Sequence, residues 1–205
     1  IAVEFLEAVL HLAIARDDLV HVIGTGWIGH RGLEFPQLAR EALWQSAELH
    51  EKAADAKSGS RVTAAKTYER YLKQYPLPLE RGLEARYRMA RIAKADGDSK
   101  REAVLMKEIY QGDLAGGSAR TDRTRYLGAN AALVMAEPAV AEYRRVALVE
   151  PLARNLKLKK AKMEDALKAY AVAANYGVAD VTTAATFQTA SAGAVLTASP
   201  LICLA

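Results

Sequence analysis

The sequence predicts an all-α protein in which antiparallel helical hairpins stack as an α-solenoid. Hydrophobic residues make up 51% of the 205 residues, yet only 7% are aromatic, and this alanine-rich composition favours closely packed helices over a sheet. Short segments containing Pro or Gly separate long stretches with helical periodicity. One spacing of small and large residues also occurs twice, far apart along the chain.

The repeated spacing consists of a small residue, an aromatic residue four positions later and a third residue three positions after that. These offsets fall on one stripe of an α-helix, where a small residue lets a neighbouring helix approach closely. We therefore expect both stripes to face other helices. The two sets are Ala64, Tyr68 and Tyr71, and Ala166, Tyr170 and Ala173.

In the first half of the chain, amphipathic periodicity predicts helices over residues 1–16, 37–55 and 61–75. The segment "AKSGS" at 56–60 separates the last two, because Gly and Ser favour turns. The segment "PLPLE" at 76–80 ends the third helix, since proline lacks the amide hydrogen that a helix interior needs.

The second half contains four further periodic stretches. "DGD" forms a tight connection between the first two of them, as in antiparallel pairs, and "QGDLAGGSA" forms a looser loop. Pro138 and Pro151 suit first helical positions, so we expect helices to begin at both, and Gly177 is expected to end the last helix. The predicted helices span 80–95, 98–111, 120–136 and 152–176.

Residues 181–205 contain no charged residue. The helical periodicity of apolar residues is lost from Ser191 onward, and a membrane-spanning helix is only weakly indicated. We expect an N-terminal helix and irregular connection over 1–36 and a helical-repeat array over 37–187. Residues 188–205 are expected to be an atypical tail, truncated or altered in reading frame.

The chain begins at Ile1 without an initiator Met, and Glu4 and Glu7 interrupt its first apolar run. This pattern is neither a signal peptide nor a membrane span. We expect the chain to be a fragment of a longer protein. The lone Cys203 excludes an internal disulfide and a cysteine-based zinc site, and it gives no indication of compartment.

The net charge of +4 is unevenly distributed, because residues 1–60 carry 5 Lys and Arg against 9 Asp and Glu, whereas residues 61–180 carry 23 against 15. At about 100° per residue, the strongest basic run spreads around its helix. A solvated face is therefore favoured over a nucleic-acid site, which needs a directed stripe with stacking aromatics. A basic helical-repeat protein that binds nucleic acid remains an alternative. The run consists of Arg154, Lys157, Lys159, Lys160 and Lys162.

The segment "GTGWIG" matches the G-x-G-x-x-G pattern of dinucleotide-binding folds, whose glycines permit a tight turn and close approach to a pyrophosphate. Gly32 and Pro36 oppose the helix that should follow, and no βαβ unit completes a sheet. An irregular turn is therefore favoured. A nucleotide-binding enzyme that uses Gly24, Gly26 and Gly29 remains an alternative.

No catalytic, cofactor or metal site is predicted. The four histidines are scattered, and "HEKAA" lacks the second histidine of an H-E-x-x-H zinc site. No P-loop, nucleophile elbow or paired-carboxylate motif is recognisable. The sequence therefore predicts a protein that is not an enzyme.

The chain resembles tetratricopeptide repeat proteins. Residues 64–76 match the family's second-helix pattern, and residues 166–173 match three of its positions. "LWQSAELH", "YRMARIA" and, more loosely, "YLGANAA" resemble first helices, with Ala47, Ala90 and Gly128 in the small position. The repeats are degenerate, because some of them depart from the norm of about 34 residues.

A narrower resemblance is to large tetratricopeptide proteins of Gram-negative bacteria that are assigned to TonB-like envelope systems. It rests on the amino-acid sequence of the stretch from "GGSARTDRTRYLGANAALVMAEP" to "VADVTTAATFQTA". It implies a periplasmic or envelope-associated scaffold that binds a protein or peptide in a helix-lined groove, without a cofactor.

In this family the first helices of the pairs line a concave groove, so the resemblance implies that their outward positions contact a peptide. Packing between repeats is an equally open interpretation of Trp44 and Tyr87. The chain lacks the Lys and Asn pairs with which chaperone-binding members hold a C-terminal carboxylate. The implied partner-binding residues are Trp44, Glu48, Tyr87, Arg91, Lys94 and Arg125.

Overall fold

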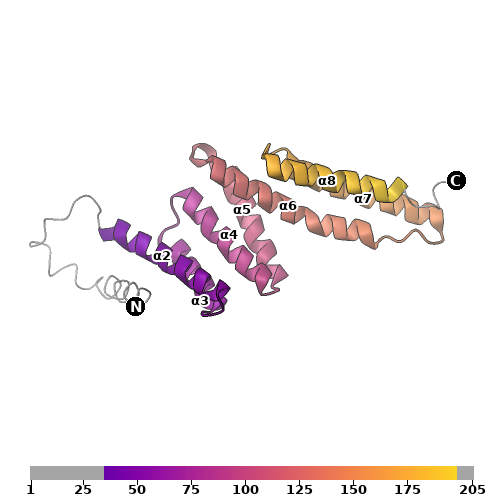
Figure 1. Cartoon of the computed structure of the whole chain (residues 1–205). Helices are drawn as coiled ribbons and strands as arrows, with labels where there is room; N and C mark the ends of the chain where they lie inside the picture. The colour runs from indigo at the N-terminus through magenta and orange to yellow at the C-terminus, as the bar shows by residue number, and fades with distance from the viewer. Residues whose placement is uncertain (1–34, 198–205) are drawn as a thin grey trace, which may run out of the picture. The chain divides into compact units, whose positions relative to one another are not determined.

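A computed structural model describes residues 35–197 and the side chains of residues 37–191. All regular structure in this part of the chain is helical (Figure 1), which confirms the all-α prediction. The α-helices are α2 (Phe35–Asp55), α3 (Arg61–Gln74), α4 (Leu79–Ala95), α5 (Ser99–Ala115), α6 (Asp122–Arg145), α7 (Leu152–Ala174) and α8 (Ala179–Thr197). A short 3₁₀ turn, Gly117–Ala119, lies between α5 and α6.

The chain divides between Pro78 and Leu79 into two compact units. The N-terminal unit contains the α2–α3 hairpin, and the C-terminal unit contains α4 to α8. This division falls inside the array that was predicted over 37–187.

Two predictions concern residues outside the described range. They are the helix over 1–16 and the turn formed by Gly24, Gly26 and Gly29. Within residues 35–197, no helix has an apolar stretch long enough to cross a membrane.

The predicted stripe of α3 forms the centre of the N-terminal hairpin. Ala64, Tyr68 and Tyr71 are all buried, and the ring of Trp44 on α2 lies edge-on to the two tyrosine rings, with centroids 5.6 and 5.1 Å away. The Tyr68 hydroxyl donates a hydrogen bond to Glu51 Oε2 at 2.8 Å. The large rings are therefore packed and the buried hydroxyl is satisfied.

In the C-terminal unit each helix packs against the next one in the chain. Helix α6 also contacts α4 and α8, so it touches every other helix of the unit. Short connections join these helices as successive hairpins (Figure 1). Helix α6 is therefore the element around which the unit is organised.

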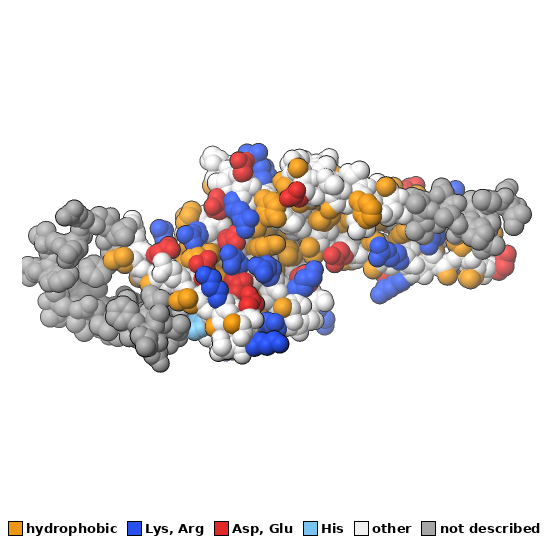
Figure 2. Space-filling model, in the orientation of Figure 1, with side chains coloured by type: hydrophobic (Ala, Val, Ile, Leu, Met, Phe, Trp, Pro, Cys, Tyr) orange, Lys and Arg blue, Asp and Glu red, His pale blue; other side chains and the backbone are white. Residues whose placement is uncertain are grey.

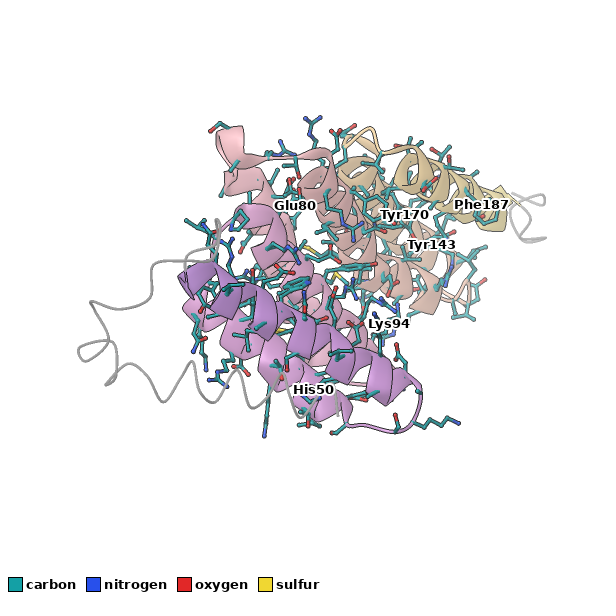
Figure 3. The ribbon with its side chains drawn as sticks, turned by 60° about the vertical axis from the view of Figure 1, so that its left-hand side comes forward. His50, Glu80, Lys94, Tyr143, Tyr170 and Phe187 are labelled. Carbon is teal, nitrogen blue, oxygen red and sulfur yellow. The ribbon has the colours of Figure 1, made fainter. Side chains whose placement is uncertain are left out.

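Alanine forms most of the core shared by α6, α7 and α8. The small residues allow the helix backbones to approach closely, and the ring of Tyr170 fills the space between them (Figure 3). The stripe of Ala166, Tyr170 and Ala173 is buried, as its spacing predicts. The buried members are Ala129, Ala132, Ala136, Val140, Ala166, Tyr170, Ala173, Val181 and Ala185.

Helix α6 runs through Pro138, so the prediction that a new helix begins there is wrong. A proline costs about 3 kcal/mol in a helix interior. Ala136, Val140 and Tyr143 are buried on both sides of it, whereas Pro138 itself is exposed. Each large apolar side chain that is buried contributes about 1.5–3 kcal/mol, so continuous packing of this stripe outweighs the lost hydrogen bond.

The bounds of α7, Leu152–Ala174, are close to the predicted 152–176, and Pro151 is the N-cap and not the first helical residue. The helix begins at Leu152, directly after Pro151. It ends before Gly177, whose φ of 69° lies in the left-handed region that glycine adopts without strain.

Besides α6, two helices continue beyond the points where their periodicity was expected to end. Helix α5 continues to Ala115, because its buried stripe extends to Asp113. Helix α8 continues to Thr197, although its rhythm was predicted to fade from Ser191. The Ser191 hydroxyl donates a hydrogen bond to the Phe187 carbonyl at 2.9 Å, so this polar group is satisfied inside the helix.

Gly128→Ala should destabilise the C-terminal unit. A Cβ at this position would lie 2.9 Å from both Asp113 Oδ2 and the Tyr176 hydroxyl. We expect the free energy of unfolding, measured in urea, to fall by about 1–3 kcal/mol. Gly112→Ala is the matched control, because its Cβ would meet the end of the flexible Leu83 side chain at 2.8 Å. Alanine ordinarily stabilises a helix relative to glycine, so a gain in stability at Gly128 would contradict the prediction.

Candidate functional site

A network of charged side chains joins α4 to α6. Glu84 of α4 lies at its centre, where Oε1 accepts a hydrogen bond from Arg88 Nε at 3.0 Å and Oε2 accepts one from Arg123 Nε of α6 at 2.9 Å. Only 12% of the Glu84 side chain is exposed. The Arg123 guanidinium also lies over the Tyr126 ring, 5.2 Å from its centroid. These contacts hold both arginines in defined positions.

A second contact attaches the start of α6 to α4. Thr121 and Thr124 form a capping box, in which each side chain accepts a hydrogen bond from the other's backbone amide. The Thr121 hydroxyl donates to Glu80 at 2.6 Å. Glu80 and Glu84 are one helical turn apart, so successive turns of α4 are fastened to α6. Glu80 and Lys94 mark the two ends of α4 in Figure 3.

Three of the predicted partner-binding residues, Tyr87, Arg91 and Lys94, lie on one stripe of α4. Arg91 follows Arg88 by three positions, so it continues the side of α4 that faces α6. Arg91 and Lys94 are exposed, and Tyr87 is half-buried. Lys94 pairs with Glu102 of α5 at 3.6 Å. The structure thus brings these three residues onto one exposed side of the helix.

Arg125, the predicted residue of α6, lies on a different side of that helix. It is two residues from Arg123, or about 200° around the axis, and its guanidinium pairs with Asp122 at 3.8 Å. Arg123 and Tyr126 occupy the α4 side and were not predicted. Arg123 is placed there by its hydrogen bond to Glu84 of α4, a contact between helices that no spacing within α6 indicates.

The other two predicted residues, Trp44 and Glu48, belong to the N-terminal unit. Trp44 is 4% exposed and packs against Tyr68 and Tyr71. The packing interpretation therefore accounts for its position. Glu48 is half-buried and lies one turn further along α2. A role for this pair in partner binding stays a prediction.

Trp44→Ala should destabilise the α2–α3 hairpin by about 3–5 kcal/mol, because it removes the ring that packs against both tyrosines. Hydrogen exchange followed by mass spectrometry should show faster exchange across α2 and α3. Peptides from α6 and α7 serve as the internal control. Unchanged protection of α2 and α3 would contradict a packing role and leave the ring available for a partner.

A buried polar cluster lies where α5, α6 and the end of α7 meet. Asp113 is 0% exposed and accepts two hydrogen bonds from Arg120, at 3.1 Å to Oδ1 and 2.7 Å to Oδ2. The Arg120 guanidinium lies 6.0 Å from the centroid of the Tyr176 ring. Gly128 leaves the space that the Asp113 carboxylate and the Tyr176 hydroxyl occupy. The bidentate pair compensates the buried carboxylate and joins α5 to the connection that precedes α6.

Burial and this charge pair change the acid–base properties of the cluster. The hydrogen bond to Asp113 raises the pKa of Arg120. Burial raises the pKa of Tyr176 well above its ordinary value, and the Asp113 charge acts in the same direction. The Tyr176 hydroxyl makes no hydrogen bond of good geometry, although it is buried beside that carboxylate. Burial also raises the pKa of Tyr143 and of Tyr170.

Tyr176→Phe should make the C-terminal unit less sensitive to alkaline pH. A tyrosine whose pKa is higher in the folded than in the unfolded state stabilises the fold fully below about pH 10. That stabilisation is lost as the pH rises further, because the unfolded chain ionises first. Urea midpoints measured from neutral pH to above pH 10 should therefore fall less steeply in the variant than in the wild type.

Near neutral pH, the same substitution should leave stability unchanged or raise it by up to about 1 kcal/mol, since it removes a buried hydroxyl that lacks a hydrogen bond. Tyr75→Phe, at a half-buried position in α3's C-cap, is the control. A large loss of stability at neutral pH would show that the Tyr176 hydroxyl has a partner in solution.

In the part of the chain that the structure describes, no group of three His, Cys, Asp or Glu side chains is arranged to hold a metal ion. Searches against protein-family models, curated proteins and solved structures find no match to the chain. The charged face formed by α4 and α6 is the candidate site, because hydrogen bonds to Glu80 and Glu84 order its polar groups.

Proposed function

We propose that the chain is a non-catalytic scaffold whose C-terminal unit binds a protein or peptide along the face formed by α4 and α6. The observation that carries this proposal is the arrangement of arginines on that face. Glu84 holds Arg88 and Arg123 in position, and Arg91 continues the same side of α4. Side chains that are ordered before binding lose less entropy when a partner docks.

The charge of α4 indicates the chemistry of the partner. Between Leu79 and Ala95, five Lys and Arg face two Glu, and both of these Glu accept hydrogen bonds from α6 groups. The surplus positive charge complements acidic side chains on a partner. Arginine and tyrosine are also residue types that protein interfaces favour, and Tyr87 and Tyr126 are half-buried beside the charged groups.

The order of helix contacts supports a tetratricopeptide-like array, which we propose for the C-terminal unit. Helix α4 contacts α6, and α6 contacts α8, as the first helices of successive hairpins do in a stacked array. In such an array α4 and α6 line the same side. The envelope location implied by the narrower resemblance stays a prediction.

Arg91→Glu should weaken partner capture by about tenfold, because it replaces an attraction for acidic groups with a repulsion. The tagged full chain is incubated with an envelope extract at moderate salt after nuclease treatment. Mass spectrometry then quantifies each protein that remains bound. Helicity and thermal unfolding should match the wild type, since Arg91 is exposed.

Lys107→Glu is the matched control, because it makes the same charge change on an exposed position of α5. A separate variant, Arg125→Glu, tests whether the predicted partner-binding residue of α6 contributes to capture. Equal capture by the wild type and Arg91→Glu would exclude this face as the binding site. If the wild type captures proteins from an untreated extract but none after nuclease treatment, the nucleic-acid alternative is favoured.

A further inference from the structure

We propose that the tip of the α6–α7 hairpin binds the surface of membranes that contain anionic lipids. The tip comprises residues 142–162, which are the end of α6, the connection and the first half of α7. It contains seven Lys and Arg against two Glu, and so carries a net charge of +5, whereas the whole chain carries +4. One-tenth of the residues therefore carries a net positive charge slightly larger than that of the whole chain.

The connection at the tip is held in a defined conformation. Lys159 Nζ donates a hydrogen bond to the Val146 carbonyl at 2.7 Å, and Asn155 Nδ2 donates to the Val149 carbonyl at 2.7 Å. Both bonds run from α7 back to the chain that follows α6. The Val149 side chain remains 59% exposed, so the connection presents an aliphatic group to the outside.

The cations of α7 differ in how far they are exposed to solvent. Lys159 is 8% exposed, and its ammonium lies 4.8 Å from the centroid of the Tyr143 ring. Arg154, Lys157 and Lys160 are exposed. The basic run therefore spreads around the helix, as expected, and its members differ in burial. Burial turns one cation inward and leaves three on the outer side.

Aliphatic side chains lie among these cations. Leu158 is 46% exposed, and it is adjacent to Lys157 and one turn from Arg154 on the same helix. Arg144 and Arg145 at the end of α6 are also exposed. Figure 2 shows basic and hydrophobic side chains side by side along this end of the hairpin.

The placement of the α7 cations works against local stability. The first turn of α7 contains no acidic residue, and Arg154 lies at a helix N-terminus, where the helix dipole favours negative charge. Stability alone would select Asp or Glu at such positions. An unfavourable local arrangement that remains exposed is typical of a surface that interacts with a partner of opposite charge.

The combination of residue types favours a membrane over a nucleic acid. Anionic headgroups attract Lys and Arg, while Val and Leu insert at the boundary with the acyl chains. Nucleic-acid surfaces commonly add aromatic side chains that stack on bases. The one aromatic residue of the tip, Tyr143, is 2% exposed and is not available for stacking.

The tip is separate from the face proposed to bind a protein. Arg123 and Arg144 lie 21 residues apart on α6, which corresponds to about 30 Å along the helix axis. Substitutions at one surface should therefore leave the other unchanged, and each proposal can fail without the other.

The test is co-sedimentation of the full chain with vesicles made of equal parts phosphatidylserine and phosphatidylcholine. We expect binding to these vesicles and not to vesicles of phosphatidylcholine alone. Each Lys near an anionic surface strengthens partition roughly fivefold, so Lys157→Glu with Lys160→Glu should weaken it about twentyfold or more. Binding should also decrease as salt is raised from about 0.1 M to about 1 M, since the Debye length falls from about 10 Å to about 3 Å.

A second variant tests the aliphatic contribution without changing charge. Val149→Ser with Leu158→Ser should weaken partition and abolish the residual binding at high salt. Lys100→Glu with Lys107→Glu, on exposed positions of α5, is the matched charge control and should bind like the wild type. Arg91→Glu should also bind vesicles normally. Circular dichroism melts should coincide for all variants.

Three results would overturn the proposal. Equal binding to phosphatidylcholine vesicles would exclude recognition of anionic lipid. An equal loss of vesicle binding in the α5 control, Lys100→Glu with Lys107→Glu, would show that binding depends only on the net charge of the chain. Displacement of the vesicles by an oligonucleotide that binds the tip more tightly would assign the same cations to a nucleic acid.

Discussion

The close packing of α6 against its neighbours is the constraint on which the C-terminal unit depends. Ala129, Ala132 and Ala136 occupy the buried side of α6, with Gly128 at the point where α5 and the end of α7 approach it. Small side chains contribute little buried area individually. Their value is that they let neighbouring backbones come close enough for dense packing around Tyr170.

This constraint also determines where the surfaces of α6 lie. Because packing against the neighbouring helices occupies much of α6, its charged residues are confined to exposed positions, most of them near its two ends. At the start, Arg123 is held by Glu84; at the end, Arg144 and Arg145 project beyond the last buried ring, Tyr143. One continuous helix thus separates two basic surfaces.

Much of the helical architecture could be predicted, because it depends on local spacing. The stripes of Ala64, Tyr68 and Tyr71 and of their counterparts in α7 are buried as expected. The start of α7 and, to within two residues, its end followed from Pro151 and Gly177. The passage of α6 through Pro138 was missed, because it depends on packing against α7, which local propensity does not contain.

The candidate site was predictable in part for the same reason. Tyr87, Arg91 and Lys94 share a stripe of one helix, so their spacing alone places them together. Arg123 depends on a pairing between two helices, and choosing it over Arg125 requires the helical phase of α6. At the tip, the direction of Lys159 depends on a carbonyl and a ring from the preceding helix. The spacing of residues within one helix does not specify which side chains of another helix they contact.

The two basic surfaces differ in how their charges are arranged, and this difference argues for different partners. On the α4–α6 face, Glu80 and Glu84 fix neighbouring groups through hydrogen bonds. Fixed donors suit a folded or extended partner whose acceptors also have fixed positions. At the tip, cations outnumber acids by seven to two and sit among exposed aliphatic side chains. Arg145 of the tip pairs with Glu142 at 2.8 Å, and Lys159 is held by the Val146 carbonyl. The remaining density of cations suits a surface whose headgroups rearrange laterally, because affinity there depends on charge and buried apolar area more than on geometry.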